Sequence, residues 1–518
     1  MSRVLWSPVW TFRCVGPKPS ARTRATTHSL TRGFTTTPTL LLSTTELWQL
    51  NKFNLTVDSD RLWDTIHSTA RWTAPKAIPN DDIRTAGLAR LTLSEEDKQA
   101  RDWFVETTKS LGCQVHVDQI GNIFAIRPGL KSTKAPATFA GSHLDSQPSG
   151  GRFDGVLGVS AGIEMLRTLN DNHIETEGPV GVVNWTNEEG AKYPISMMGS
   201  GVWAGQISLE DAWQVKSVTA GPSTSGTTSP PTVKEELEQI GYLGSVPAHF
   251  GEGIPIGAHF ELHIEQGPRL EKAKQKIGVV QGVQAYKWFT LTVTGREAHA
   301  GTTEMASRAD AMHAAAQLML KVHQIAKHGC SDGKGLATFG RLSCMPGSVN
   351  TIAGYVEMSL DMRHPTDEGL AEMEENLYRV CKTMNTIQKN GEPGEDATSN
   401  SGGPRVTVKQ DFASHAIMFD ERAIDCVEQS AANVLAGEEA MGGHEQKVQK
   451  MMSGAGHDSV RTNLHCPTAM IFVPSKGGIS HNPVEWTEKE DCAIGANVLM
   501  QSVLRMDKFR NERGDFYE

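Results

Sequence analysis

The stretch "ATFAGSHLDSQPSGGRFDGVLGVSAGIEMLRTLND", residues 137–171, places an apolar run, a glycine-rich loop and a helical pattern one after another. ATFAGSH predicts a buried strand, and GVLGVSAGIEMLRTLND predicts a helix. A second apolar run, PVGVVNWTNEE at residues 179–189, predicts another buried strand. Strands that alternate with helices indicate an α/β layer fold with an at least partly parallel sheet. Ligands of such folds gather beyond the carboxyl ends of strands, which is where GSHLDS and TNEE lie.

The alternation of strands and helices continues on both sides of this stretch. Residues 58–112 have a helical pattern, with a Ser-x-x-Asp helix start at Ser94 and a glycine stop at Gly112. Residues 113–128, CQVHVDQIGNIFAIRP, predict a hairpin. Residues 219–232 are rich in Ser, Thr, Gly and Pro, so we expect a flexible surface insertion there.

A second pattern begins at about residue 285, in the order strand, helix, strand, strand, helix, strand, with PRVTVKQ at residues 404–410 as the last strand. This is the order of a ferredoxin-like unit. We assign residues 285–404 to the domain that it forms. Because the first pattern resumes after it, we predict a two-domain α/β protein in which a smaller domain is inserted into a larger one. The larger domain comprises residues 46–284 and 405–518, and the cleft between the domains is the expected place for a site.

The charge of the chain is unevenly distributed. Residues 1–45 contain six basic residues and no acidic residue, whereas the whole chain has a net charge of −10. An Arg-, Ser- and Thr-rich start without acids is typical of a mitochondrial transit peptide, so we predict a targeting leader and a mitochondrial location. A disordered tail, a misassigned start codon and a cytoplasmic location are the alternatives. The acidic remainder argues against a nucleic-acid partner, because no basic patch is visible to neutralise phosphates.

The cysteines and the apolar runs exclude other classes of protein. The eight cysteines form no C-x-x-C pair, which argues against a disulfide framework and a structural zinc knot and fits a reducing compartment. No apolar run approaches the roughly eighteen residues of a membrane-spanning helix, so we expect no membrane partner. Any bound metal must therefore be held by histidine and carboxylate.

Residues of the metal-ligand type recur at strand ends and in glycine-rich loops. They are His143 in GSHLDS, Asp154 in GGRFDG, Glu188 and Glu189 in TNEEG, His263 in ELHIEQG, and His481 in GGISHNP. A single such residue is more often a surface or hydrogen-bonded group than a ligand. Together, imidazoles and carboxylates without thiolates suit borderline divalent ions such as zinc, manganese, cobalt or nickel.

The acids among these residues have distinct expected roles. Two ions about 3.5–4 Å apart need a bridging carboxylate, and we assign this role to Asp154. Asp145 follows His143 by two residues, on the same side of an extended segment, and is expected to orient its ring. Of the adjacent pair Glu188 and Glu189, one can ligate a cation while the other, left free, moves a proton.

These motifs resemble the metal-dependent amidase, hydantoinase-associated carbamoylase family, which includes L-carbamoylases, the yeast-type β-ureidopropionase and allantoate amidohydrolase. The resemblance extends over roughly residues 58–508 and rests on GSHLDS, GGRFDG, NEEGAKYPISMMGSGVWAG, HFELHIEQGP, AHAGTT, GAGHDS and SHNP. It implies a metallo-aminopeptidase-like catalytic domain that binds two metal ions, with a smaller lid domain through which the chain forms a homodimer.

The resemblance also implies roles for individual residues. The positions that resemble metal ligands are His143, Asp154, Glu189, His263 and His481, with Asp154 bridging, and Glu188 resembles the general base. The positions that resemble substrate contacts are Gln266, His299, Asn350, Arg363 and His457. Among them, His299 is expected to donate to the developing oxyanion and to reach across from the partner subunit.

The residue pattern gives independent information on two of the remaining positions. YVEMSLDMR alternates apolar and polar residues, which places Arg363 on the open face of a strand. A guanidinium there suits a substrate carboxylate, and a salt bridge to Asp361 is the structural alternative. His259 lies four residues before His263, on the same strand face, and we expect it near the ligands without being one.

The expected reaction is metal-dependent hydrolysis of the terminal C–N bond, not a peptide bond, in an N-carbamoyl-L-amino acid. N-carbamoyl-β-alanine, the substrate of β-ureidopropionase, and allantoate remain alternatives, because one sequence does not locate the pocket walls. A metallo-exopeptidase and a catalytically silent binding protein are two further alternatives. The presence of all five ligand positions argues against a silent protein.

Overall fold

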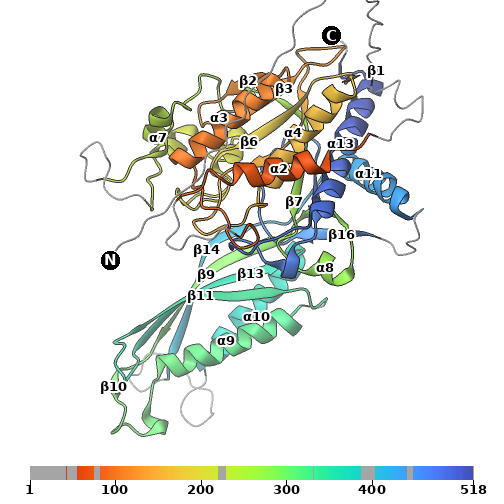
Figure 1. Ribbon diagram of the computed structural model, residues 1–518. Coiled ribbons are helices and arrows are strands. Elements are labelled where there is room, and N and C mark those ends of the chain that lie inside the picture. Colours follow the sequence, from red (N-terminus) through yellow and green to blue (C-terminus); the bar gives the residue numbers. More distant parts are fainter. Residues whose placement is uncertain are drawn as a thin grey trace, which may run out of the picture. The chain divides into compact units, whose positions relative to one another are not determined.

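The computed structural model describes residues 55–74, 82–219, 229–330, 332–386, 403–439 and 447–516, together with the backbone of residues 42–43 (Figure 1). The expected leader at residues 1–45 and residues 220–228 of the expected insertion lie outside this part, except that β1 (Leu42–Ser43) pairs with β5 (Ile174–Glu175). No helix of the described part combines the length and apolar character that crossing a membrane requires. The seven cysteines of the described part are free thiols.

A nine-stranded mixed sheet forms the centre of the larger domain. Its main path runs β15-β8-β17-β7-β4-β6-β3-β2, and β16 also pairs with β8. The strands are β2 (Gln114–Val117), β3 (Ile123–Arg127), β4 (Ala137–His143), β6 (Val180–Trp185), β7 (Ile256–Ile264), β8 (Ile277–Val283), β15 (Ile417–Met418), β16 (Val448–Ser453) and β17 (Thr468–Val473). The pairs β4–β6, β4–β7, β7–β17 and β8–β16 are parallel. The expected α/β class with a partly parallel sheet is confirmed.

The central position of this sheet follows from the burial of its apolar strands. Every residue of β4, β6 and β17 is buried, as expected for strands that are covered on both faces. Three long helices, α4 (Val156–Asp171), α11 (Glu421–Glu439) and α13 (Lys489–Glu512), contact one another or the central strands. The shorter helices are α5 (Met198–Trp203), α6 (Leu209–Gln214), α7 (Val233–Ile240), α8 (Arg269–Ala273) and α12 (Ser459–Thr462), with 3-10 turns at Met305–Ser307 and Lys476–Gly478.

The amino-terminal helical region consists of two helices instead of one continuous helical stretch. They are α2 (Ser59–Thr69) and α3 (Glu95–Ser110), and the described residues between them are not helical. The helix start at Ser94 is confirmed, because the Ser94 side chain accepts a hydrogen bond from the backbone N–H of Asp97. The glycine stop is also confirmed, since Gly112 follows α3 with a φ of +87°.

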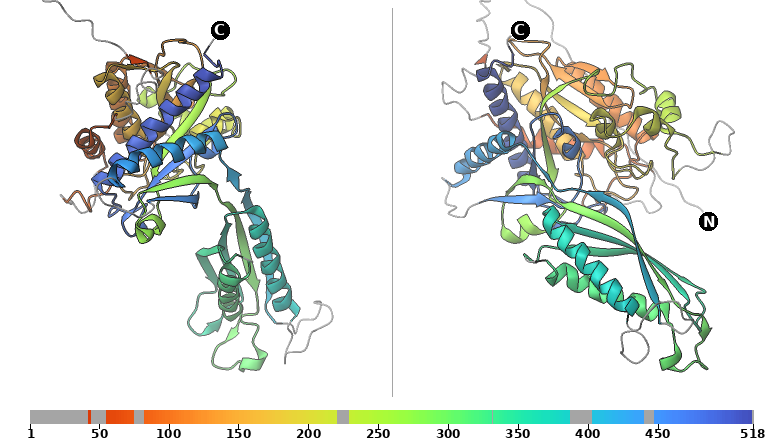
Figure 2. Two further views of the ribbon diagram at one scale, coloured as in Figure 1. Left: turned by 90° about the vertical axis from the view of Figure 1, so that its right-hand side faces the viewer. Right: turned by 180° about the vertical axis from the view of Figure 1, so that it is seen from behind.

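The smaller domain has a four-stranded antiparallel sheet in the order β11-β13-β9-β14. Along the chain its elements are β9 (Ala285–Thr294), α9 (Ala311–His328), β11 (Leu336–Met345), β13 (Tyr355–His364), α10 (Asp367–Thr386) and β14 (Arg405–Ser414). Both helices contact the sheet and each other, and Figure 2 shows them on the same face. A separate short pairing joins β10 (Ala298–His299) to β12 (Thr351–Ile352).

The expected domain boundary between residues 404 and 405 is wrong. β14 begins at Arg405 and pairs with β9 through Ser414, so the smaller sheet includes this whole strand. The sequence pattern hid the strand's length, because its register shifts between Gln410 and Phe412 and breaks the alternation. The larger domain therefore resumes after Ser414.

Candidate metal-dependent active site

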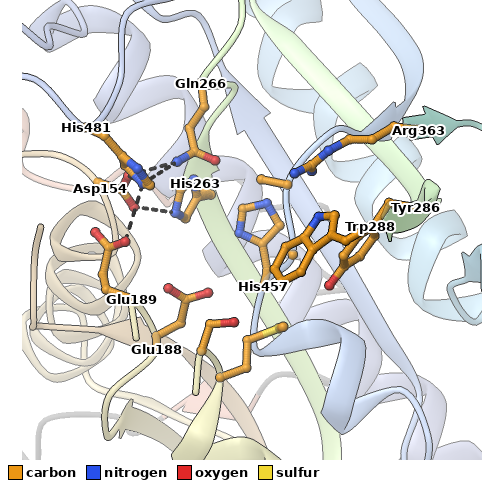
Figure 3. Close-up of a pocket in the computed structure, with 14 residues that line it drawn as sticks. Asp154, Glu188, Glu189, His263, Gln266, Tyr286, Trp288, Arg363, His457 and His481 are labelled. Carbon is orange, nitrogen blue, oxygen red and sulfur yellow. Dashed lines mark hydrogen bonds and ion pairs between the residues drawn. The ribbon is translucent and has the colours of Figure 1, made fainter. Parts of the chain in front are cut away.

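The expected ligands of the larger domain lie at the carboxyl ends of parallel strands. His143 is the last residue of β4, His263 is the last but one of β7, and Glu188 and Glu189 come shortly after β6. β4 pairs in parallel with both β6 and β7, so the ends of the three strands meet at one edge of the sheet. Asp154 and His481 approach this edge on loops (Figure 3).

Asp154 lies at the centre of the cluster, and its two oxygens face different neighbours. Oδ1 is 3.0 Å from His263 Nε2 and 3.5 Å from His143 Nε2. Oδ2 is 3.4 Å from His481 Nε2, which is itself 3.3 Å from Glu189 Oε2. The donor atoms form two groups, His143–Asp154–His263 and Asp154–Glu189–His481, each within 4.8 Å, and Asp154 belongs to both.

The donor set of each group fits a divalent cation of the zinc or manganese type, because it combines imidazoles with carboxylates. The hydrogen bonds of two rings support this fit. His143 Nδ1 donates to the backbone carbonyl of Asp145 at 2.9 Å, and His263 Nδ1 donates to that of Ile264 at 2.8 Å. Both Nε2 atoms, which face Asp154, are then free to ligate a metal.

The pKa values of the side chains in this cluster also favour the binding of a cation. Burial alone would raise the pKa of Asp154, but the neighbouring rings of His263 and His143 lower it well below its usual range. Burial raises the pKa of Glu189 to about 7. The hydrogen bond with Asp154 raises the pKa of His481 to about 9, so this imidazole holds a proton at neutral pH that a bound cation displaces.

The glycine-rich loop allows Asp154 to approach His143. Gly155 has a φ of +65°, and a Cβ at this position would lie 2.4 Å from the nearest ring atom of His143. A Cβ on Gly151 would lie 2.0 Å from Glu485 Oε1. A larger residue at either position would push the loop away from the cluster, which explains why so few side chains occur in this stretch.

Glu485 is a buried acid of the site that sequence reasoning missed. Its Oε1 accepts hydrogen bonds from the backbone N–H groups of Phe153 at 3.0 Å and Asp154 at 3.1 Å, and its Oε2 accepts one from Ser480 Oγ at 2.8 Å. Glu485 thus ties the loop of Asp154 to the loop of His481. Its only signal in the sequence is its place four residues after His481, which is not specific.

Asp145 orients the ring of His143, as expected, but through its backbone carbonyl and not through its carboxylate. Its carboxylate is 3.8 Å from His143 Nδ1, too far for a hydrogen bond, and its backbone carbonyl orients the ring instead. The carboxylate accepts from the backbone N–H groups of Glu188 at 3.4 Å and Glu189 at 3.3 Å. These two N–H groups, which lie far away in sequence, are nearer to the carboxylate than the His143 ring is.

Glu188 is adjacent to both donor groups and belongs to neither. Its Oε2 is 3.5 Å from His143 Nε2, and its side chain lines the pocket. Burial raises the pKa of Glu188 well above its usual range, so the carboxyl readily holds a proton. Asn187, in the left-handed region with a φ of 55°, donates to the carbonyls of Tyr193 and Ile195 and fixes the turn from which Glu188 projects.

The cluster opens into a pocket of about 190 Å³ that Tyr286, Trp288 and Arg363 of the smaller domain also line (Figure 3). Arg363 lies on the open face of β13, as the alternation predicted, because its apolar neighbours on that strand are buried. Its Nη2 donates to Asp361 at 2.7 Å and its Nη1 to the carbonyl of Gly454 at 2.7 Å. The alternative salt bridge is therefore present, although Arg363 still faces the pocket.

Gln266 and His457 also lie beside the ligands and line the pocket. Gln266 Nε2 donates to Asp154 Oδ2 at 2.8 Å. The ring of His457 lies 4.6 Å from that of His263, centre to centre. Burial lowers the pKa of His457 to about 3, so this ring is neutral and can hydrogen-bond a substrate without adding charge.

His299 and Asn350 are not brought to this pocket. His299 lies in β10, opposite Thr351 of β12, and the carbonyl of Asn350 accepts a hydrogen bond from the backbone N–H of Ala300 at 2.8 Å. Both side chains are exposed, and neither lines the pocket of its own chain.

His259 is buried on β7 but belongs to neither group around Asp154. Burial lowers the pKa of His259 from 6.5 to about 4. Between these pH values the ring is protonated in the unfolded chain and neutral in the folded chain. The free energy of unfolding therefore falls as the pH is lowered from 6.5 to 4. We expect the metal-free protein to lose about 3 kcal/mol more over this interval than a His259→Asn variant, as measured by urea unfolding. Equal losses would show that His259 is not buried as a neutral ring.

The fold and the donor set define a class of protein. Residues 139–505 match peptidase family M20/M25/M40, and the chain belongs to this family. The N-carbamoyl-L-amino-acid amidohydrolase of Rhizobium meliloti is 34% identical over 455 residues, which cover 87% of this chain and 97% of that protein. The allantoate amidohydrolase of Bacillus subtilis is 28% identical over 431 residues, which cover 81% and 93%.

Solved structures agree with this assignment. The crystal structure of an amidase of the hydantoinase/carbamoylase family from Burkholderia multivorans matches with a TM-score of 0.73 and 38% identity, covering 87% of this chain and 98% of that chain. The resemblance inferred from the sequence motifs is therefore confirmed.

Proposed function

We propose that the protein is a metal-dependent amidohydrolase that hydrolyses the terminal C–N bond of N-carbamoyl-L-amino acids. The observation that carries this proposal is the sharing of Asp154 between two donor groups, with Glu188 left free beside them. The relatives named N-carbamoyl-L-amino-acid amidohydrolase support the substrate class.

His143 and His263 would hold one divalent ion and Glu189 and His481 a second, with Asp154 between them. Zinc or manganese fits these donors, and nickel or cobalt is also compatible. When bound, such a pair polarises a carbonyl group and lowers the pKa of water. Gly155 and Glu485 keep the Asp154 loop in the position that both groups require.

Glu188 moves the proton in the proposed reaction. Its carboxylate takes a proton from the attacking water and delivers it to the terminal nitrogen, which leaves as ammonia. The N-carboxylated amino acid that remains loses carbon dioxide to give the free amino acid. His457 and Gln266 line the space that the carbamoyl group would occupy.

His299 and Asn350 require a second subunit for the roles that the family resemblance implies. Because both are exposed and absent from the pocket of their own chain, we propose that a homodimer forms through the smaller domain, as a lid, and brings them to the partner's site. His299 would then donate to the oxyanion.

Arg363 is proposed to bind the substrate carboxylate. Replacing Arg363 with Ala should raise KM about 10- to 100-fold and change kcat less, because a charge-assisted hydrogen bond contributes about 1.5–3 kcal/mol. Steady-state kinetics on an N-carbamoyl-L-amino acid measure both constants. Asp361→Asn is the matched control, because it frees the guanidinium and should not raise KM. An unchanged KM in Arg363→Ala would assign Arg363 to the ion pair alone.

A substrate panel tests the proposed function. Ammonia release from N-carbamoyl-L-α-amino acids, N-carbamoyl-β-alanine and allantoate, with zinc, manganese or nickel supplied, should give the highest kcat/KM for the first class. A higher value for allantoate would move the function to that of the Bacillus subtilis relative. Cleavage of dipeptides in place of all three would identify an exopeptidase, and binding without turnover of any substrate would identify a silent protein.

We also propose that residues 1–45 direct the protein to mitochondria, on the basis of their six basic and no acidic residues. A reporter fused to these residues should enter mitochondria. A reporter that stays in the cytosol would contradict the proposal.

A further inference from the structure

A second kind of metal-ligand cluster lies in the smaller domain and uses none of the residues around Asp154. Cys330 and Asp332 lie in the connection between α9 and β11, and His364 is the last residue of β13. One donor atom from each of the three lies within 4.8 Å of the others. The cluster thus brings a thiol, a carboxylate and an imidazole together from two separate parts of the chain.

The spacing of these atoms is close to that of a tetrahedral metal site. His364 Nε2 is 2.9 Å from Asp332 Oδ1. Metal–ligand bonds of about 2.0–2.3 Å separate tetrahedral ligand atoms by roughly 3.3–3.6 Å. The nitrogen and oxygen would therefore move apart by less than about 1 Å to admit an ion. The thiol lies within 4.8 Å of both and would move inward by no more than about 1.5 Å.

His364 is held in place as a metal ligand needs to be. It is 2% exposed, and its ring packs so closely on α10 that a Cβ on Gly369 would lie 2.0 Å from it. Its Nδ1 accepts a hydrogen bond from the backbone N–H of Thr366 at 3.1 Å, so the ring proton lies on Nε2, which faces Asp332. A cation at Nε2 would displace this proton, and an Nδ1–H could then donate to the carbonyl of Thr366, which is 3.2 Å away. This is the hydrogen bond that most metal-bound histidines make with their second nitrogen.

Cys330 and Asp332 complete the candidate site. Cys330 lies on its buried side and Asp332 on its solvent-exposed side. Cys330 is a free thiol that is 5% exposed, and the carbonyl of the preceding Gly329 accepts a hydrogen bond from Asn376 of α10 at 2.7 Å. Asp332 is exposed and gives an ion access from solvent. Lys334 Nζ is 3.3 Å from Asp332 Oδ2, but its side chain is 65% exposed and is free to turn away.

We propose that Cys330, Asp332 and His364 bind an additional divalent cation of the zinc class, in a site independent of the reaction. Binding converts the Cys330 thiol to a thiolate and releases its proton to solvent. One thiolate, one imidazole and one carboxylate leave a fourth position for water. The ion would join the α9–β11 connection to the end of β13 and stabilise the smaller domain.

Cobalt substitution separates this site from the ligands around Asp154, because only this site contains sulfur. After chelation, the full chain loaded with Co²⁺ should show a thiolate-to-cobalt charge-transfer band in the near ultraviolet. The band should disappear in Cys330→Ser and persist in Cys381→Ser, which alters another buried cysteine of the smaller domain. Absence of the band from the unaltered chain, or its persistence in Cys330→Ser, would overturn the proposal.

Zinc content provides the second measurement. After gel filtration in a zinc-containing buffer, Cys330→Ser should retain one zinc ion fewer per chain than Cys381→Ser. Asp332→Asn changes an exposed residue, so this variant is the alternative test if Cys330→Ser does not fold. It should bind cobalt at this site at least about tenfold more weakly, as followed by the same band, with unchanged circular dichroism. Equal zinc contents, or equal cobalt affinity in Asp332→Asn, would contradict the site.

Discussion

Glu188→Gln is expected to abolish nearly all turnover while both metal ions stay bound. Glutamine has the same size as glutamate but cannot accept the proton of the attacking water, and general-base catalysis contributes about 10²–10⁴-fold to a rate. Glu188 belongs to neither donor group, so its loss leaves the metal ligands intact. Ammonia release at saturating substrate measures kcat, and elemental analysis of the same sample measures the metal content.

The matched control for this variant is Glu189→Gln, on the neighbouring residue. Glu189 belongs to the donor group with Asp154 and His481, so its variant should lose metal as well as activity. The two variants therefore separate proton transfer from metal binding. Near-normal turnover in Glu188→Gln, or loss of metal from it, would contradict the assignment of Glu188 as the general base.

Asp154→Ala is expected to remove both ions and all measurable activity. Asp154 is the one residue common to the two donor groups, and its carboxylate also balances the imidazoles of His143, His263 and His481. Metal content should fall by about two ions per chain, the two of the cluster around Asp154. Loss of both ions would distinguish a residue that ligates two ions from a residue that ligates one.

The control for Asp154→Ala is His481→Ala, which affects one donor group. It should lose about one ion per chain and keep the ion held by His143, Asp154 and His263. Metal content after gel filtration is the measurement for both variants. If Asp154→Ala kept as much metal as His481→Ala, Asp154 would not bridge two ions.

The convergence of the five candidate ligands could be predicted because each lies at the end of a strand, shortly after one or in a glycine-rich loop, and parallel strands bring such positions to one edge. The hydrogen bonds that hold them could not be predicted. Glu485 acts by joining two loops that are more than 300 residues apart in sequence. Asp145 accepts from the backbone of Glu188 and Glu189 because a neighbouring strand turns beside it.

The smaller domain also has features that could be predicted from the sequence and features that could not. The strand–helix order of the smaller domain was readable from apolar alternation, as in β13, where buried and half-buried residues alternate. The end of β14 was not, because a register shift near Phe412 interrupts the alternation. For His299 and Asn350, an exposed position in one chain is consistent with a role that only an assembled dimer would reveal.

We infer that one carboxylate, Asp154, lies between two bound cations. Anomalous diffraction from a crystal grown with zinc tests it most directly. We expect two peaks about 3.5–4 Å apart, one beside His143 and His263 and one beside Glu189 and His481. A single peak at this cluster, or peaks that do not flank Asp154, from a crystal of fully active enzyme would contradict the inference.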